Sequence, residues 1–175
     1  ARSGWKWQWN QLMDKLAPSD QDGSYQRPPS QHKKAIVPTS HSIKDRSPKN
    51  LPCLIIGRSC PWAHRTWLVY ELRGLHQSLN LLIAKADITT GRWSIDPPWL
   101  GCNSLLDLYK KCDQPPSHRA TVPTLIDPGE TTTDKPQLLG NESTQLIEVL
   151  NQWPTIHHAP DLSPKDLEKE IKTWH

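Results

Sequence analysis

The fold is decided by residues 51–65, which read LPCLIIGRSCPWAHR. Residues 51–57 form a short apolar run bounded by proline and glycine, and this pattern predicts a buried strand. Pro61 follows at a position typical of the first turn of a helix, where a missing backbone N–H does no harm. We therefore expect a strand, a turn that carries Cys60, and a helix that continues to about Arg73 and stops at Gly74.

The remaining elements are predicted from the same kinds of signal. Residues 79–86 predict a second strand, at a distance that suits a right-handed crossover to a parallel neighbour. A helix is expected over residues 103–111, and the segment before it, with Gly91, Pro97 and Pro98, is expected to be a loop. Two further strands and a capped helix are expected at residues 121–126, 137–139 and 141–151. The predicted order is βαβαββα, an α/β fold.

Size and composition exclude several classes of protein. A chain of 175 residues and 20.0 kDa is expected to form one domain with extensions. The formal charge is only +3 and the basic residues are scattered among 18 acidic ones, so no nucleic-acid partner is expected. No stretch approaches the ~20 consecutive apolar residues of a membrane-spanning helix, so no spanning segment is expected.

The four cysteines, at positions 53, 60, 102 and 112, show neither paired spacing nor the density of a disulfide scaffold. This favours a reducing compartment, such as the cytoplasm or a plastid stroma. His64 lies four residues beyond Cys60, but no other ligands are arranged to match, so no metal site is expected.

The chain is expected to have three parts. Residues 1–50 are a Pro-rich extension that contains a short amphipathic stretch at Trp5, Trp9, Leu12, Met13 and Leu16. Such a stretch would pack on a protein partner or on another domain, with membrane-surface attachment as the alternative. Residues 51–151 form the folded domain, and residues 152–175 form a linker.

Cys60 is the strongest candidate for a reactive group. A thiol between the end of a strand and the start of a helix lies among unsatisfied backbone N–H groups, which favour a negatively charged sulfur. Ala63 stands where a second cysteine would close a Cys-X-X-Cys pair, so a mixed disulfide at Cys60 would need an external thiol to resolve it. The alternative is a buried structural cysteine.

Two further segments are candidates for ligand binding. Pro123 interrupts a predicted strand, which suggests a cis bond that turns the backbone groups of Val122 toward a ligand. Residues 141–144 begin the last helix, where free amides and the hydroxyl of Ser143 suit a carboxylate and Glu142 could pair with an amino group. The alternative for this segment is a plain helix cap.

In this order on a βαβαββα frame, the three segments resemble the glutathione site of the glutathione transferase superfamily. A closer resemblance is to the glutathionyl-hydroquinone reductases, the Xi class, and it covers most of the chain. The motifs that carry it are Ser59-Cys60-Pro61-Trp62-Ala63-His64-Arg65, Gly91-Arg92-Trp93, Asp96-Pro97, the helix at residues 105–109, Arg119, Val122-Pro123, Asn141-Glu142-Ser143 and the flanking stretches 23–27, 160–162 and 164–167.

The resemblance implies a thioredoxin-like domain that binds glutathione. The implied glutathione-binding residues are Trp62, Trp93, Arg119, Val122, Pro123, Glu142 and Ser143. Trp93 would cover the glutathione, and Arg119 would contact its glycine end. Val122 would pair with its backbone, while Glu142 and Ser143 would hold its γ-glutamyl end.

The activity that the resemblance implies is the removal of glutathione from a quinol-type conjugate. Cys60 would attack the glutathione sulfur, and a second glutathione would release the enzyme as glutathione disulfide. Arg92 departs from the family pattern, since a second glycine is expected before the tryptophan. The family's all-helical C-terminal domain is expected to be absent, because the chain stops at His175, where that domain would start; residues 152–175 would then form the linker and the start of that domain.

Two alternatives to this enzyme remain at the level of sequence. The first is a non-catalytic thioredoxin-like subunit of a larger assembly, which would dock through its Trp-containing extension. The second is a conjugating transferase in which glutathione itself is the nucleophile. Cys60 argues against the second, because a cysteine at that position readily forms a mixed disulfide.

Overall fold

The computed structural model describes residues 43–87, 90–115, 119–155 and 158–173. These residues belong to one of the two units into which the chain divides, residues 32–175, and only this unit is described below. The amphipathic stretch expected near the N-terminus lies outside the described residues, and so does the motif at residues 23–27.

The predicted strand, helix and strand are present and form a parallel unit. Strand β1 (Cys53–Gly57) is buried along its whole length and pairs in parallel with β2 (Asn80–Asp87). Helix α3 (Pro61–Leu72) connects them, with proline in its first turn. Gly74 ends this segment at φ 61°, a conformation that a glycine adopts without steric cost, and a short 3-10 turn, η2 (Leu75–Gln77), leads into β2.

The structure corrects the expected loop between residues 87 and 103. Most of it forms strand β3 (Arg92–Trp99), followed by the short β4 (Cys102–Ser104), and both pair antiparallel. Pro97 and Pro98 fit within β3 because the β3–β4 register shifts between Ser94 and Trp99, where no continuous ladder needs their missing N–H groups.

The second half of the domain follows the predicted order. Helix α4 (Leu105–Lys111) is capped by Ser104, whose hydroxyl accepts a hydrogen bond from the backbone N–H of Asp107. Strands β5 (Thr124–Asp127) and β6 (Gln137–Gly140) form an antiparallel hairpin, and helix α5 (Ser143–Asn151) follows. A 3-10 turn, η1 (Pro48–Asn50), precedes the domain and α6 (Glu168–Thr173) follows it.

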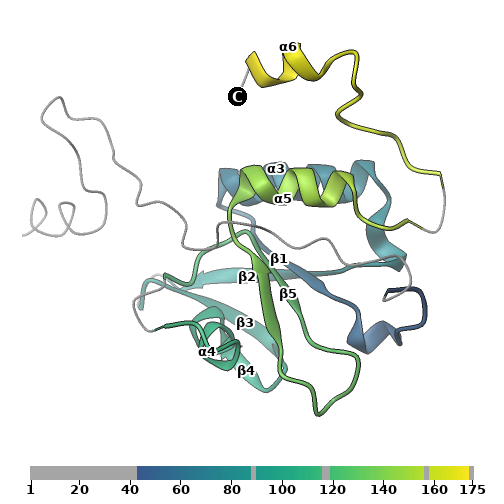
Figure 1. The fold of residues 1–175 in the computed structure, drawn as a ribbon. Coiled ribbons are helices and arrows are strands. Elements are labelled where there is room, and N and C mark those ends of the chain that lie inside the picture. The colour runs from purple at the N-terminus through teal and green to yellow at the C-terminus, as the bar shows by residue number, and fades with distance from the viewer. Residues whose placement is uncertain (1–42, 88–89, 116–118, 156–157, 174–175) are drawn as a thin grey trace, which may run out of the picture. The chain divides into compact units, whose positions relative to one another are not determined.

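The six strands form one mixed sheet in the order β4-β3-β2-β1-β5-β6. Figure 1 shows α3 and α5 side by side on one face of this sheet, with α4 beside β3 and β4. The most deeply buried large side chains come from β1, β5, the helices and the turn after α5, and include Leu54, Ile56, Leu125, Leu146 and Trp153. This is the thioredoxin-like α/β fold that the sequence predicts, with two additional strands.

Candidate functional site

Cys60 lies at the start of helix α3, as the sequence predicts. It is the N-cap residue, its backbone is extended, and its N–H donates to the carbonyl of Gly57 at 3.0 Å. The Cys60 Sγ atom lies 3.4 Å from the carbonyl oxygen of Val122, which comes from a segment 62 residues later in the chain. The turn after β1 and the segment before β5 therefore meet at this thiol.

The other three thiols are in a different environment. All four cysteines are free, but Cys53, Cys102 and Cys112 are buried whereas Cys60 is partly exposed. Burial raises the pKa of Cys53 and of Cys102, and raises that of Cys112 to about 12. Since a buried neutral thiol is a poor nucleophile, these three cysteines are structural and Cys60 is the accessible sulfur.

The Val122–Pro123 peptide bond is cis, as the sequence suggests. Both residues are buried, with Val122 only 6% exposed. Because Pro123 stands immediately before Thr124, the first residue of β5, the bend falls outside the regular ladder. The carbonyl of Val122 is consequently directed at the thiol of Cys60 rather than at a neighbouring strand.

Trp93 reaches the same region from strand β3, where it pairs with Ala86 of β2. Its indole lies against Gly57, the last residue of β1: a Cβ atom on Gly57 would be 2.4 Å from Trp93 Cζ3 and 2.5 Å from Cη2. The same Cβ would be 3.1 Å from Val122 Cγ2. Gly57 thus gives Trp93 and Val122 room to approach one another beside the thiol turn. The sequence pattern alone indicates only that Gly57 ends a strand, since this close approach depends on residues far away in the chain.

The N-terminus of α5 lies beside α3, the helix that follows Cys60. Ser143 is 1% exposed, and its Oγ atom has no hydrogen-bond partner among the described residues. Glu142 is the half-buried N-cap residue, and its side chain does not cap the helix. Arg65 of α3 donates to the Thr144 hydroxyl at 2.7 Å, which joins this helix start to the helix that carries Cys60. A buried hydroxyl without a partner at a helix N-terminus suits a ligand carboxylate.

Trp62 and Arg119, two of the predicted glutathione-binding residues, are both exposed. Trp62 is 51% exposed on α3, and the guanidinium carbon of Arg65 lies 5.4 Å from the centroid of its ring. Arg119 is exposed in the loop before β5, immediately after a segment outside the described residues. His64 is exposed, and its ring forms a T-shaped pair with that of Trp67. His118 and His157 lie outside the described residues.

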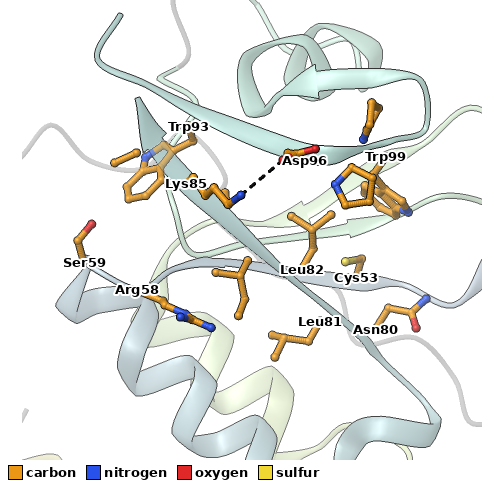
Figure 2. Close-up of a pocket in the computed structure, with 15 residues that line it drawn as sticks. Cys53, Arg58, Ser59, Asn80, Leu81, Leu82, Lys85, Trp93, Asp96 and Trp99 are labelled. Atoms are coloured by element: carbon orange, nitrogen blue, oxygen red, sulfur yellow. Dashed lines mark hydrogen bonds and ion pairs between the residues drawn. The ribbon is translucent and has the colours of Figure 1, made fainter. Parts of the chain in front are cut away.

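A cavity of about 830 Å³ adjoins the thiol turn along β2 and β3. Figure 2 shows Ser59 and Trp93 at one end of this cavity, and Asn80 and Trp99 at the other. Lys85 and Asp96 form an exposed ion pair of 3.5 Å across it. Cys60 does not line the cavity, so the cavity lies beside the candidate site rather than at the thiol.

The described residues contain no group of three or more His, Cys, Asp or Glu side chains that could hold a metal ion. None of the helices in the described segments is long and apolar enough to span a membrane. In the described part of the chain the site offers one accessible thiol, at Cys60, and one buried hydroxyl, at Ser143.

A mixed sheet with α3 and α5 on one face, a cysteine at the N-cap of α3 and a cis Val122–Pro123 bond whose carbonyl faces that cysteine define the thioredoxin-like class. Within this class the chain belongs to the glutathione S-transferase family: residues 59–153 match the model of that family's N-terminal domain. The matched residues include Cys60, Trp93, Val122 and Ser143.

The relatives confirm the resemblance to the Xi class. Glutathionyl-hydroquinone reductase PcpF of Sphingobium chlorophenolicum is 30% identical over 127 residues, which are 67% of this chain and 39% of PcpF. The crystal structure of the Xi glutathione-S-transferase of Phanerochaete chrysosporium matches with a TM-score of 0.68 and 25% identity, over 89% of this chain and 52% of that one. The glutathione-bound structure of YqjG from Escherichia coli K-12 matches with a TM-score of 0.56 and 26% identity, over 73% and 43%. The chain spans about two fifths to one half of the length of these proteins.

Proposed function

We propose that this chain carries the thiol-transfer half of a glutathionyl-hydroquinone reductase, with glutathione as the bound thiol and Cys60 as the nucleophile. The observation that carries the proposal is the accessible Cys60 thiol at the start of α3, 3.4 Å from the Val122 carbonyl. The names of the relatives support the class of reaction, since two of them are called glutathionyl-hydroquinone reductases.

In the proposed reaction the Cys60 thiolate attacks the sulfur of a glutathionyl-hydroquinone. A sulfur–sulfur bond forms between Cys60 and glutathione, and the bond from that sulfur to the aromatic carbon breaks. The electron pair remains on the aromatic carbon, which takes up a proton, so the hydroquinone leaves reduced. A second glutathione thiolate then attacks the glutathionyl sulfur of the mixed disulfide, releasing the Cys60 thiolate and glutathione disulfide.

The proposed glutathione site surrounds this thiol. The Val122 backbone would pair with the tripeptide as a strand does, and the Ser143 hydroxyl and the backbone N–H groups at the start of α5 would donate hydrogen bonds to the γ-glutamyl carboxylate. Glu142 would attract the γ-glutamyl amino group, and Arg119 the glycine carboxylate. Trp93 would cover one side of the ligand. The glutathione-bound state of the YqjG relative supports this choice of ligand. Turnover by free glutathione would place the protein in a reducing compartment.

The test is a single-turnover experiment with a glutathionyl-hydroquinone. We expect the wild-type chain to release one equivalent of free hydroquinone per Cys60 without added glutathione, because the first half-reaction needs only the enzyme thiol. Cys60→Ser should release none, whereas Cys102→Ser should match the wild type because that thiol is buried. Release that is equal in Cys60→Ser and in the wild type would contradict the proposal.

A further inference from the structure

The buried hydroxyl of Tyr109 forms hydrogen bonds with two segments next to the candidate site, the turn at Thr121–Thr124 and the residue before the α5 N-cap, Asn141. Tyr109 of α4 is 1% exposed, and its hydroxyl lies 3.4 Å from the carbonyl oxygen of Thr121 and 3.3 Å from the Thr124 hydroxyl. The side-chain amide of Asn141 donates to the same Tyr109 oxygen at 3.2 Å. The Thr124 hydroxyl in turn can donate to the carbonyl of Gly140 at 3.3 Å.

These contacts form a short relay from Asn141 to Tyr109, then to Thr124, and then to Gly140. Tyr109 thereby bonds to residues beside both halves of the candidate site. Thr121 and Thr124 enclose the cis Val122–Pro123 turn, whose carbonyl faces Cys60. Asn141 immediately precedes Glu142 and the buried Ser143 at the start of α5.

The relay lies where β5 and β6 stop pairing. Leu125 pairs with Gly140, and no ladder pair is found beyond these residues toward the site in the described part of the hairpin. The residues before Leu125 and those after Gly140 therefore have no backbone ladder to each other, although Thr124 still pairs with Ile55 of β1. The Tyr109 hydroxyl bonds to both segments and joins them in place of a ladder. The low dielectric of the core strengthens each of these hydrogen bonds.

The phenol is suited to this position. Burial raises the pKa of Tyr109, so the hydroxyl keeps its proton at physiological pH and acts at once as donor and acceptor. Phenylalanine would fill the same space among Leu105, Leu108 and the sheet but would leave the Asn141 amide and the Thr124 hydroxyl with one partner fewer.

We propose that Tyr109 is a positioning residue for the glutathione site: its hydroxyl holds the Thr121–Thr124 turn and the Asn141–Ser143 helix start at the spacing that one tripeptide needs. The proposal rests on the proposed function for the identity of the ligand. It assigns no contact between Tyr109 and glutathione, because the phenol lies in the core behind the site.

The test compares Tyr109→Phe with Tyr70→Phe. Tyr70 is a suitable control because it is also buried, at 4% exposure, and its hydroxyl donates one hydrogen bond, to the Leu79 carbonyl at 3.2 Å, away from the site. Hydrogen exchange of the free protein, read by mass spectrometry, reports on residues 121–125 and 140–145 without any ligand. Glutathione affinity is measured by calorimetry in a Cys60→Ser background, so that no disulfide forms.

We expect Tyr109→Phe to speed amide exchange in both segments together and to weaken glutathione binding about fivefold to tenfold, the effect of one lost buried hydrogen bond. Tyr70→Phe should change neither segment nor the affinity.

The remaining outcomes would overturn either the positioning role of Tyr109 or the proposed function. Faster exchange in both segments with unchanged glutathione affinity would overturn the positioning role, and so would unchanged exchange in Tyr109→Phe. If the wild-type chain binds no glutathione, the proposed function fails; the positioning role for glutathione then fails with it, while the exchange data still show separately whether Tyr109 joins the two segments.

Discussion

Replacing Gly57 by alanine tests the geometry of the candidate site most sharply. The new Cβ would lie 2.4 Å from Trp93 Cζ3 and 3.1 Å from Val122 Cγ2. Nonbonded carbon atoms settle at about 3.5–4.0 Å, so the indole has to retreat by about 1 Å or more. Because Trp93 is held by backbone pairing with Ala86, the movement has to come mainly from its side chain.

The expected effects are on stability and on glutathione binding. Overpacking of this kind costs about 1–3 kcal/mol, so the urea midpoint of Gly57→Ala should fall accordingly. An indole that no longer lies over the thiol turn should weaken glutathione binding about threefold to tenfold, the usual worth of one aromatic contact. Urea denaturation and calorimetry in a Cys60→Ser background measure the two effects.

A double-mutant cycle separates this clash from a general weakness of the strand. In Trp93→Phe the distal atoms of the indole are gone, so adding Gly57→Ala should cost at least about 1 kcal/mol less than it does in the wild type. Gly91→Ala is the matched control, because Gly91 has φ 65° and no atom within 4 Å of the added Cβ. Its cost should be the same with either ring. Additive effects of Gly57→Ala and Trp93→Phe would refute the packing described here.

Three further predictions concern stability. Trp153→Phe removes the hydrogen bond from Trp153 Nε1 to the Ser78 carbonyl at 3.2 Å and should cost about 1–3 kcal/mol in urea denaturation; an unchanged midpoint would contradict that bond. Arg46→Ala breaks a nearly buried ion pair with Asp127 and should cost up to about 3 kcal/mol, whereas replacing both partners by Met and Leu should recover most of it. Burial raises the pKa of Cys112 to about 12, so as the pH rises the unfolded chain loses the Cys112 proton before the folded chain does. The free energy of unfolding should therefore fall between about pH 9 and pH 12, and Cys112→Ala should show a shallower fall over that range.

Much of the fold could be predicted because its signals are local. An apolar run, a proline in the first helical turn and Gly74 after the helix located β1 and α3 to within two residues. The strand β3 could not be predicted in this way, since Pro97 and Pro98 indicate a loop wherever a continuous ladder is assumed. The register shift that accommodates them is a property of the paired strand and has no signature in the segment itself.

Some features of the candidate site could also be predicted from local sequence, whereas others could not. The position of Cys60 at a helix start and the cis bond before Pro123 follow from neighbours in the sequence. Asn141 was expected to help cap the last helix, but its amide donates to Tyr109, 32 residues away, and the helix starts at Ser143. Such contacts depend on which segments the sheet brings together, so local spacing could not reveal them.

The central claim is that Cys60 is the sulfur that exchanges with glutathione. Its most direct test is intact-protein mass spectrometry after mild oxidation with glutathione disulfide, comparing the wild type with Cys60→Ser and with Cys53→Ser. We predict one glutathione adduct in the wild type and in Cys53→Ser, none in Cys60→Ser, and removal of the adduct by free glutathione. An absence of adduct in the wild type, or an adduct that persists in Cys60→Ser, would contradict the claim.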